Sequence, residues 1–377
     1  MVYKKIHGEE VSRLGFGSMR LPMVEKYGKM RVDDEKSVLL LRRAYEMGIN
    51  YFDTAWTYCN EDGERALGYA LKPFRSKVYL STKLPMWNVK KPDDYWVYLE
   101  KALKNLDTDY IDFYHFHSVN KSFWDKIIEY KFLDFAQKAK AQGLIRHISF
   151  SFHDKPELLK EIVDQQIFET VVCQYNLLNT INEDAIAYAK ERGLGVFIMG
   201  PLAGGNITLA DKNFMQKFET DITSPAELGL KFVWGNKNID CLLSGIDSLK
   251  VLEENIQYES RPDLDENQWS SIRQTAENVS DLLEIYCTDC QYCFVCPRNI
   301  RPANIFKQYN SWKTWGLKDA ALKAYNVMLT NEWWYGNRPD LCTGCGACMK
   351  KCPQKLNIPQ LLKKVTAEFE QLRVSNR

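Results

Sequence analysis

Four side chains able to transfer or orient protons follow predicted strands in the first third of the sequence. Asp53, Lys83 and His117 each end a short apolar segment that is typical of a buried strand. Tyr58 lies five residues after Asp53. A lysine ammonium beside a phenol makes the phenolic proton easier to transfer, and a histidine can hydrogen-bond a substrate oxygen. Each residue alone has a structural explanation, but together, past successive strands, they indicate an active site at a barrel mouth.

The elements between these residues alternate between short apolar strands and amphipathic helices, a pattern typical of a parallel sheet covered by helices. Eight predicted strands favour closure, and no G-x-G-x-x-G joins a strand to a helix as in a doubly wound sheet. We therefore expect the α/β class, with a (β/α)8 TIM barrel over residues 1–262. The first predicted strand leads into a loop within 14–22, and the other predicted strands are 50–53, 78–82, 110–116, 145–151, 169–176, 195–202 and 239–245. The predicted helices are 35–47, 62–71, 93–106, 121–142, 156–165, 182–192, 224–234 and 248–258.

Length and composition set limits on the class of protein. The 377 residues suit a barrel of about 250 residues with an appendage. The net charge of +1 gives no indication of a nucleic-acid or membrane-surface partner. The N-terminal residues lack the apolar core of a signal peptide, and no apolar run approaches the length of a membrane span. We expect a cytoplasmic protein.

The last quarter of the sequence has a different pattern, which predicts a second domain over residues 263–377. One helix is predicted over 265–284, and an aromatic-rich helical segment over about 302–335. Two cysteine runs, each ending in Cys-Pro, flank that segment. Zinc ribbons use paired C-x2-C and rarely carry four cysteines so close, so the runs indicate another metal centre, with a structural metal clip as the alternative.

Asp53, Tyr58, Lys83 and His117 together resemble the catalytic tetrad of the aldo/keto reductase family. The resemblance implies that Tyr58 is the proton donor and that Lys83 lowers its pKa. It also implies that Asp53 holds the lysine and that His117 hydrogen-bonds the substrate oxygen. His115 is the competing histidine, because it lies on the same side of its strand but one layer deeper. The family histidine sits at the strand's exit, which favours His117.

The resemblance also implies a nicotinamide cofactor site. Ser151 and Gln174 resemble the residues that bind the nicotinamide amide, but Phe152 stands where the family has an asparagine, unless His153 replaces it. No counterpart exists for the basic residues that hold the 2′-phosphate of NADP. Asp247 lies there and suits a free ribose hydroxyl or caps a helix, so NAD is at least as plausible as NADP. The full predicted set is Gly17, Met19, Ser151, Gln174, Gly200, Leu202, Gly245, Asp247, Ser248 and Asn255.

The cysteine runs resemble a bacterial two-cluster ferredoxin, in which the fourth cysteine of each run binds the other cluster. The resemblance implies two [4Fe-4S] clusters. The first run has two residues before its last cysteine where three are usual. The implied ligands are Cys287, Cys290, Cys293 and Cys352 for one cluster, and Cys342, Cys345, Cys348 and Cys296 for the other.

The combination resembles aldo/keto reductases that carry a C-terminal ferredoxin-like domain. It implies an oxidoreductase that interconverts a carbonyl and an alcohol in a small molecule and transfers electrons through its clusters. A nicotinamide gives two electrons as a hydride and a cluster carries one, so we also consider a flavin intermediary and a one-electron carrier protein as partner. The alternative is an electron-transfer module whose barrel docks a partner or binds a flavin.

Overall fold

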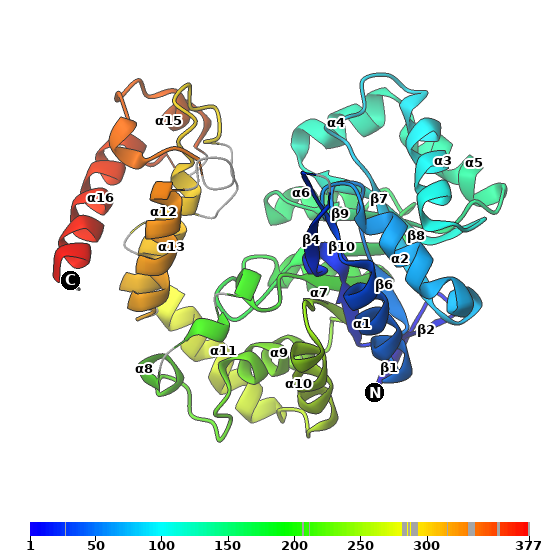
Figure 1. Ribbon diagram of the computed structural model, residues 1–377, viewed down its shortest axis with the longest axis horizontal. Coiled ribbons are helices and arrows are strands. Elements are labelled where there is room, and N and C mark those ends of the chain that lie inside the picture. Colours follow the sequence, from blue (N-terminus) through cyan, green and yellow to red (C-terminus); the bar gives the residue numbers. More distant parts are fainter. Residues whose placement is uncertain are drawn as a thin grey trace. The chain divides into compact units, whose positions relative to one another are not determined.

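The protein is described here from a computed structural model of the chain (Figure 1). Internal contacts divide the chain into two compact units. Residues 1–204 and 226–269 form the first, and residues 205–225 and 270–377 form the second. The predicted boundary after residue 262 stays a prediction. The structure describes residues 1–26, 28–205, 207–210, 212–280, 285, 287, 293–314, 316–330, 336–352 and 355–375.

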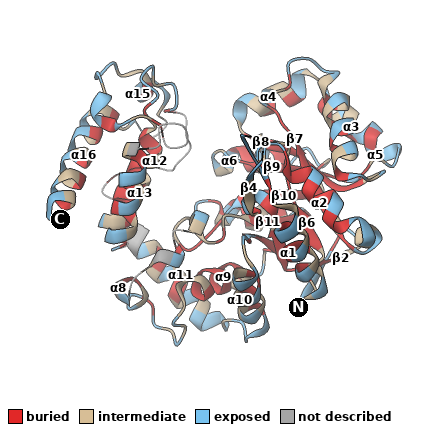
Figure 2. Ribbon diagram, in the orientation of Figure 1, coloured by how far each residue is buried: buried red, intermediate tan, exposed pale blue. Residues whose placement is uncertain are grey.

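The first unit is the predicted (β/α)8 barrel, a closed ring of eight parallel strands. Nearly all residues of these strands are buried, because side chains fill the barrel on one face and pack under helices on the other (Figure 2). The strands are β3 (Leu14–Gly17), β6 (Tyr51–Asp53), β7 (Tyr79–Leu84), β8 (Ile111–Val119), β9 (Ile145–Phe152), β10 (Thr170–Gln174), β11 (Gly195–Met199) and β12 (Cys241–Gly245).

Helices follow the barrel strands and cover the outside of the ring (Figure 1). Their ends follow local capping rules: the Asp33 carboxylate accepts the Lys36 N–H at the start of α1, and Gly48 adopts a φ of 98° just past its end. The helices of this unit are α1 (Asp34–Glu46), α2 (Gly63–Leu71), α3 (Asp94–Leu106), α4 (Lys121–Glu129), α5 (Phe132–Ala141), α6 (Pro156–Val163), α7 (Glu183–Glu191), α9 (Pro225–Gly235) and α10 (Leu249–Ser260), with the short 3-10 helices η1 (Ser18–Arg20) and η2 (Lys72–Lys77).

The predicted single helical stretch over 121–142 is wrong. The structure has two helices, α4 and α5, separated at Lys131, whose φ of 53° lies in the left-handed region. No glycine or proline marks this break, so the helical periodicity on both sides concealed it. The segment predicted as helix 265–284 is helical over α11 (Glu266–Ser280), and residues 281–284 lie outside the described part.

The floor of the barrel, at the N-terminal ends of the strands, is closed by the hairpin of β1 (Tyr3–Ile6) and β2 (Glu9–Ser12). Ile6 and Val11 of this hairpin join a buried cluster with Tyr51, Phe113 and Phe197 from inside the barrel. The sequence prediction omitted the hairpin, because its strands carry mostly exposed polar residues. It excludes water from the lower end of the core.

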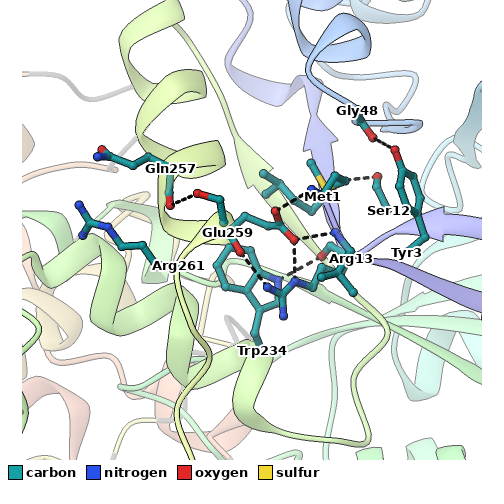
Figure 3. A network of polar contacts seen from close by, with 12 residues as sticks. Met1, Tyr3, Ser12, Arg13, Gly48, Trp234, Gln257, Glu259 and Arg261 are labelled. Atoms are coloured by element: carbon teal, nitrogen blue, oxygen red, sulfur yellow. Dashed lines mark hydrogen bonds and ion pairs between the residues drawn. The ribbon is translucent and has the colours of Figure 1, made fainter.

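A buried ionic network also lies on the floor (Figure 3). The Arg13 guanidinium donates to the Glu259 carboxylate at 2.9 Å and to Asp263 at 2.6 Å. It also donates to the Glu259 backbone carbonyl at 2.9 Å and lies 4.9 Å from the ring centre of Trp234. The Lys231 ammonium donates to the Arg261 carbonyl at 2.7 Å. These contacts tie the first barrel strand to the last two helices of the ring.

The loops at the mouth include a second hairpin, β4 (Met23–Lys26) with β5 (Lys29–Val32), and the 3-10 helix η3 (Ala203–Gly205). Within the part of the chain that the structure describes, no helix is long and apolar enough to cross a membrane.

The second unit is mainly helical. Its core is built from one face each of α12, α13 and α16, where Phe306, Tyr309, Tyr325 and Phe369 are buried together. The aromatic-rich segment predicted as helical contains two helices, α12 and α13, and residues 315 and 331–335 are not described. The elements are η4 (Ile207–Leu209), α8 (Lys212–Met215), α12 (Pro302–Lys313), α13 (Lys318–Thr330), η5 (Pro339–Leu341), α15 (Ala347–Lys351) and α16 (Ile358–Ser375).

Candidate active site and cysteine pocket

A buried ion pair anchors the mouth of the barrel. Asp53 ends β6 and Lys83 lies on the neighbouring β7, and the ammonium is 2.7 and 2.8 Å from the two carboxylate oxygens. The Lys83 ammonium also donates to the Thr54 carbonyl at 2.6 Å, and Ser81 donates to Asp53 at 2.7 Å. Burial alone would lower the pKa of Lys83, but Asp53 and then Tyr58 together outweigh it, so the pKa is raised. The lysine therefore stays charged.

Tyr58 lies beside this ion pair, with its ring centre 4.9 Å from the Lys83 ammonium. The next three residues, 59–61, all have φ between 53° and 64°, a left-handed conformation that non-glycine residues rarely adopt. Gly63 starts α2 directly behind the tyrosine, where an added Cβ would lie 3.2 Å from the Tyr58 Cβ. A strained turn and a close backbone contact thus set the position of the phenol.

Burial raises the pKa of Tyr58 above its ordinary value, and Lys83 opposes that rise without reversing it. The expectation that the lysine lowers the phenol's pKa therefore holds for the lysine's own effect, but the net shift is upward. The phenol is accordingly protonated over the neutral range, as a proton donor must be.

His117 completes the group. Its ring centre is 6.2 Å from that of Tyr58, nearly perpendicular to it, and 4.7 Å from that of Trp87. Burial and then the Lys83 charge hold the pKa of His117 well below its usual value, so the imidazole is neutral and can donate one hydrogen bond. Its buried Nδ1 has no hydrogen-bond partner among the described residues.

The competing histidine, His115, lies in register with Lys83 one layer down and is fully buried. Burial holds its pKa far below the usual value as well. His153 stands near the same lysine and keeps exposed surface. The surrounding protein and then Lys83 lower the pKa of His153 to about 4. His117 and His153, unlike His115, are placed where a ligand at the mouth could reach them.

Ser151 has a structural task next to His117. Its hydroxyl oxygen accepts the backbone N–H of Ser118 at 2.8 Å, just where β8 departs from regular pairing and Ser118 adopts a φ of 56°. The serine therefore orients the residue that follows the histidine, and its own hydroxyl hydrogen remains to be donated. Gln174 is exposed at the end of β10. Tyr175 instead packs inward against Phe232, with ring centres 5.4 Å apart.

The loop after β11 forms another part of the mouth. Gly200 has a φ of 64°, and its carbonyl accepts the Asn176 side-chain amide at 2.9 Å. Leu202 is half-buried, and Ala203, Gly204 and Gly205 all have positive φ. The Ala203 N–H donates to the Gly200 carbonyl at 2.9 Å, which closes the loop as a tight turn.

Arg20 is a functional candidate that the sequence prediction missed. Its guanidinium donates to the Gly204 carbonyl at 2.6 Å, and an added Cβ on Gly245 would lie 3.2 Å from the Arg20 Cδ. Arg20 thus crosses from the end of β3 to the loop after β11 and lies over the exposed Gly245 at the end of β12. Gly204 and Gly245 lie about 184 and 225 residues after Arg20 in the sequence, so no local motif could indicate that Arg20 contacts them.

The remaining predicted cofactor residues divide into exposed and buried positions. Met19 is 51% exposed at the mouth. Ser248 caps α10 by accepting the Val251 N–H, and its hydroxyl donates to the exposed Asp247. Asn255 is buried and donates to the Ser244 hydroxyl at 2.7 Å. The Gly17 Cα is close to Ser244, since an added Cβ would lie 3.2 Å from its carbonyl oxygen. Their part in cofactor binding stays a prediction.

The second unit holds a pocket lined by four predicted cluster ligands: Cys296, Cys342, Cys345 and Cys348. Ile300 and Leu362 line it as well. Among the described residues, no three Cys, His, Asp or Glu side chains converge on a single ion-sized site. The four cysteines therefore line one pocket, but in this structure they do not form a group that could hold a single metal ion.

Of the other four predicted ligands, Cys287, Cys293 and Cys352 pack against the same hydrophobic core. Cys290 lies outside the described residues. The structure therefore brings one predicted ligand set together around a pocket and describes three members of the other.

Comparison with known proteins agrees with this architecture. Residues 13–277 match the aldo/keto reductase family, and residues 286–363 match the 4Fe-4S dicluster domain. L-galactose dehydrogenase of Arabidopsis thaliana is 26% identical over 73% of this chain and 93% of its own length. Methylglyoxal reductase DkgB of Escherichia coli O157:H7 is 27% identical over 55% of this chain and 77% of its own length.

Among solved structures, the holo form of aldo-keto reductase AKR11C1 from Bacillus halodurans aligns with a TM-score of 0.64 at 24% identity. The alignment covers 73% of this chain and 96% of that one, and at this identity it supports the fold alone. The predicted fold class and family are both confirmed. The chain is an oxidoreductase that belongs to the aldo/keto reductase family and carries a 4Fe-4S dicluster domain after its barrel.

Proposed function

We propose that the barrel interconverts a carbonyl and an alcohol in a small molecule, with Tyr58 as the proton donor in the reductive direction. The convergence of the Asp53–Lys83 ion pair with Tyr58 and His117 at the mouth carries this proposal. The neutral His117 donates a hydrogen bond to the substrate oxygen, while the Tyr58 hydroxyl delivers a proton to the same atom. The charged Lys83 then stabilises the phenolate that forms.

A nicotinamide cofactor fits the remaining features of the mouth. The cradle between Arg20 and Gly245 would be filled by any larger side chain at position 245, and it offers a cation to a phosphate. The capped N-terminus of α10 lies directly after it and favours an anion. When bound, the nicotinamide supplies or accepts the hydride. Arg20, Ser248 and the loop after β11 would hold the phosphates, and Ser151 and Gln174 the amide.

The cofactor's identity follows from charge. Asp247 is exposed beside Ser248 and would repel a 2′-phosphate, so we propose NAD in preference to NADP. A single phosphate would also suit FMN, which makes flavin the competing ligand for the same cradle.

For the second unit we propose two [4Fe-4S] clusters with the predicted ligands. The fit is supported by the donor set, because four cysteines around one pocket with largely apolar walls suit a multi-iron centre. Bound clusters supply one-electron transfer. Cys296, Cys342, Cys345 and Cys348 would hold one of them, and Cys287, Cys290, Cys293 and Cys352 the other. We further propose that a one-electron carrier protein is the partner.

Anaerobic titration of the purified protein tests these proposals. We expect about eight irons per chain, and tighter binding of NADH than of NADPH or FMN. With methylglyoxal as the probe carbonyl, we expect NADH oxidation in proportion to the aldehyde consumed. Zinc in place of iron would reject the clusters. FMN binding together with no nicotinamide binding would reject the nicotinamide site.

A further inference from the structure

Several exposed apolar side chains are sequence neighbours of the cysteines that line the pocket, and we call these flanking segments, residues 293–301 and 336–352, the rim. Phe294 and Val295 precede Cys296, Leu341 precedes Cys342, and Met349 follows Cys348. Their exposed fractions are between 38% and 47%. Single exposed apolar residues are ordinary, but four beside the ligands of one pocket indicate a surface that a partner covers.

The same rim is strongly basic. The segments 293–301 and 336–352 hold five basic residues and one acidic residue, whereas the whole chain has a net charge of only +1. The acidic residue, Asp340, pairs with Arg338 at 3.0 Å. Arg298 lines the pocket itself, and Lys350 and Lys351 are exposed and make no ion pair with any described residue. Among the described residues, basic charge without an ion-pair partner therefore lies next to the cysteines in the sequence.

The pocket also reaches the protein surface. Cys345 is exposed, while Cys348 on the other side of Gly346 is buried. A cluster held by these thiolates would have one edge at the surface, where a docked protein could exchange electrons with it. The left-handed turn at Gly344 and Gly346, each with a φ of 73°, presents this edge.

We propose that this rim, formed by residues 293–301 and 336–352, is the docking surface for an acidic one-electron carrier protein. The inference rests on the proposed clusters. The apolar side chains supply contact area at the centre, and Arg298, Lys350 and Lys351 attract a negatively charged partner. A small anionic molecule would use the charges but not the four apolar side chains.

Two probes of opposite charge test the surface on cluster-loaded protein whose iron content has been verified. Each cluster, first reduced by one electron from dithionite whose excess is then removed, gives that electron to the metal of the oxidant. The metal passes from Fe(III) to Fe(II) in anionic Fe(EDTA) and from Co(III) to Co(II) in cationic cobalt hexammine. We expect the rate constant for the anionic oxidant to fall with rising salt, and that for the cationic oxidant to rise. The double substitution of Lys350→Glu and Lys351→Glu should lower the rate constant for the anionic oxidant about tenfold at low salt.

The matched control is the double substitution of Lys4→Glu and Lys5→Glu, which makes the same charge change at two exposed residues of β1. It should leave the rate constants for both oxidants unchanged. As a second measurement, carbodiimide should cross-link Lys350 or Lys351 to an acidic flavodoxin, and Leu341→Ser should reduce that product. Rates that are independent of charge and salt, or cross-links confined to other surfaces, would overturn the docking proposal. Protein without iron would instead reject the proposed clusters.

Discussion

The two ends of the barrel use charged groups in opposite ways. On the floor, Arg13 contacts two carboxylates and a carbonyl, and Asp112 lies between Arg75 at 2.8 Å and Arg146 at 3.1 Å. At the mouth, the Asp53–Lys83 pair is closed, but the His117 Nδ1 is buried without a hydrogen-bond partner among the described residues. The floor also has such an atom, the Nε2 of His147, but its charged groups are paired with one another.

This difference indicates that the charged groups on the floor stabilise the fold, whereas those at the mouth serve the reaction. Buried polar groups normally have their hydrogen bonds satisfied, so the open Nδ1 of His117 beside Tyr58 is a place that a ligand can complete. The backbone shows the same contrast, because residues 59–61 keep a costly left-handed conformation beside Tyr58. We therefore expect substitutions at the mouth to reduce activity in a folded protein, and substitutions on the floor to reduce stability in an active one.

The largest expected effect is at the mouth. Tyr58→Phe keeps the ring's packing and removes only the transferable proton, so turnover of methylglyoxal should fall by about 10²- to 10⁴-fold. Steady-state kinetics with saturating NADH measures this. Tyr69→Phe removes a hydroxyl from a residue that is 60% exposed on α2 and should leave turnover unchanged. Equal turnover in Tyr58→Phe and wild type would refute the proton-donor assignment.

On the floor, Arg13→Met should lower the free energy of unfolding by about 3 kcal/mol, because the buried carboxylate of Glu259 loses its guanidinium partner and keeps only the Val2 N–H and the Met1 ammonium. Urea denaturation followed by circular dichroism measures the change. Arg43→Met is the matched control, since Arg43 pairs with Glu46 on an exposed helix surface and should cost less than about 1 kcal/mol. Equal losses in the two variants would contradict a special role for the floor network.

A pH dependence of stability is also expected from the floor. Burial would raise the pKa of Glu169, but hydrogen bonds from His147 and Lys140 outweigh it and lower the pKa to about 2. An unfolded glutamate has a pKa of about 4.3, so this stabilisation is complete above that pH and is lost as the pH falls toward 2. Glu169→Gln should flatten the decline in unfolding free energy below pH 5. An unchanged slope would contradict the assignment.

The smallest expected effect returns to the mouth. Arg20→Met should weaken NADH binding about tenfold, because one charge-assisted hydrogen bond to a phosphate is lost. Fluorescence titration of NADH measures the Kd, and unfolding should occur at the same urea concentration as in wild type. The same Arg43→Met variant serves as control. If binding is unaffected, Arg20 only closes the loop after β11 and does not contact the cofactor.

The sequence predicted those parts of the site that strand ends position. Asp53, Lys83 and His117 could be located because a period of two and an apolar run define where each strand stops. Cysteine spacing likewise indicated the second domain, since metal ligation constrains it. These signals are local, so each can be recognised in the sequence without knowing which other elements pack beside it.

Other features depend on tertiary contacts and were missed. Arg20 is meaningful only because Gly204 and Gly245 lie beside it in space. The break at Lys131 has no glycine or proline to mark it, and the floor hairpin has few apolar residues. The net upward shift of the Tyr58 pKa depends on burial, which a sequence motif does not report.

The most direct test of the division between mouth and floor measures turnover and unfolding free energy on the same preparations of Tyr58→Phe and Arg13→Met. We predict that Tyr58→Phe unfolds like wild type while losing about 10²-fold or more of its turnover. Arg13→Met should turn over like wild type at a temperature where it is folded, while losing about 3 kcal/mol of stability. A stable but inactive Arg13→Met, or an active but unstable Tyr58→Phe, would contradict the division.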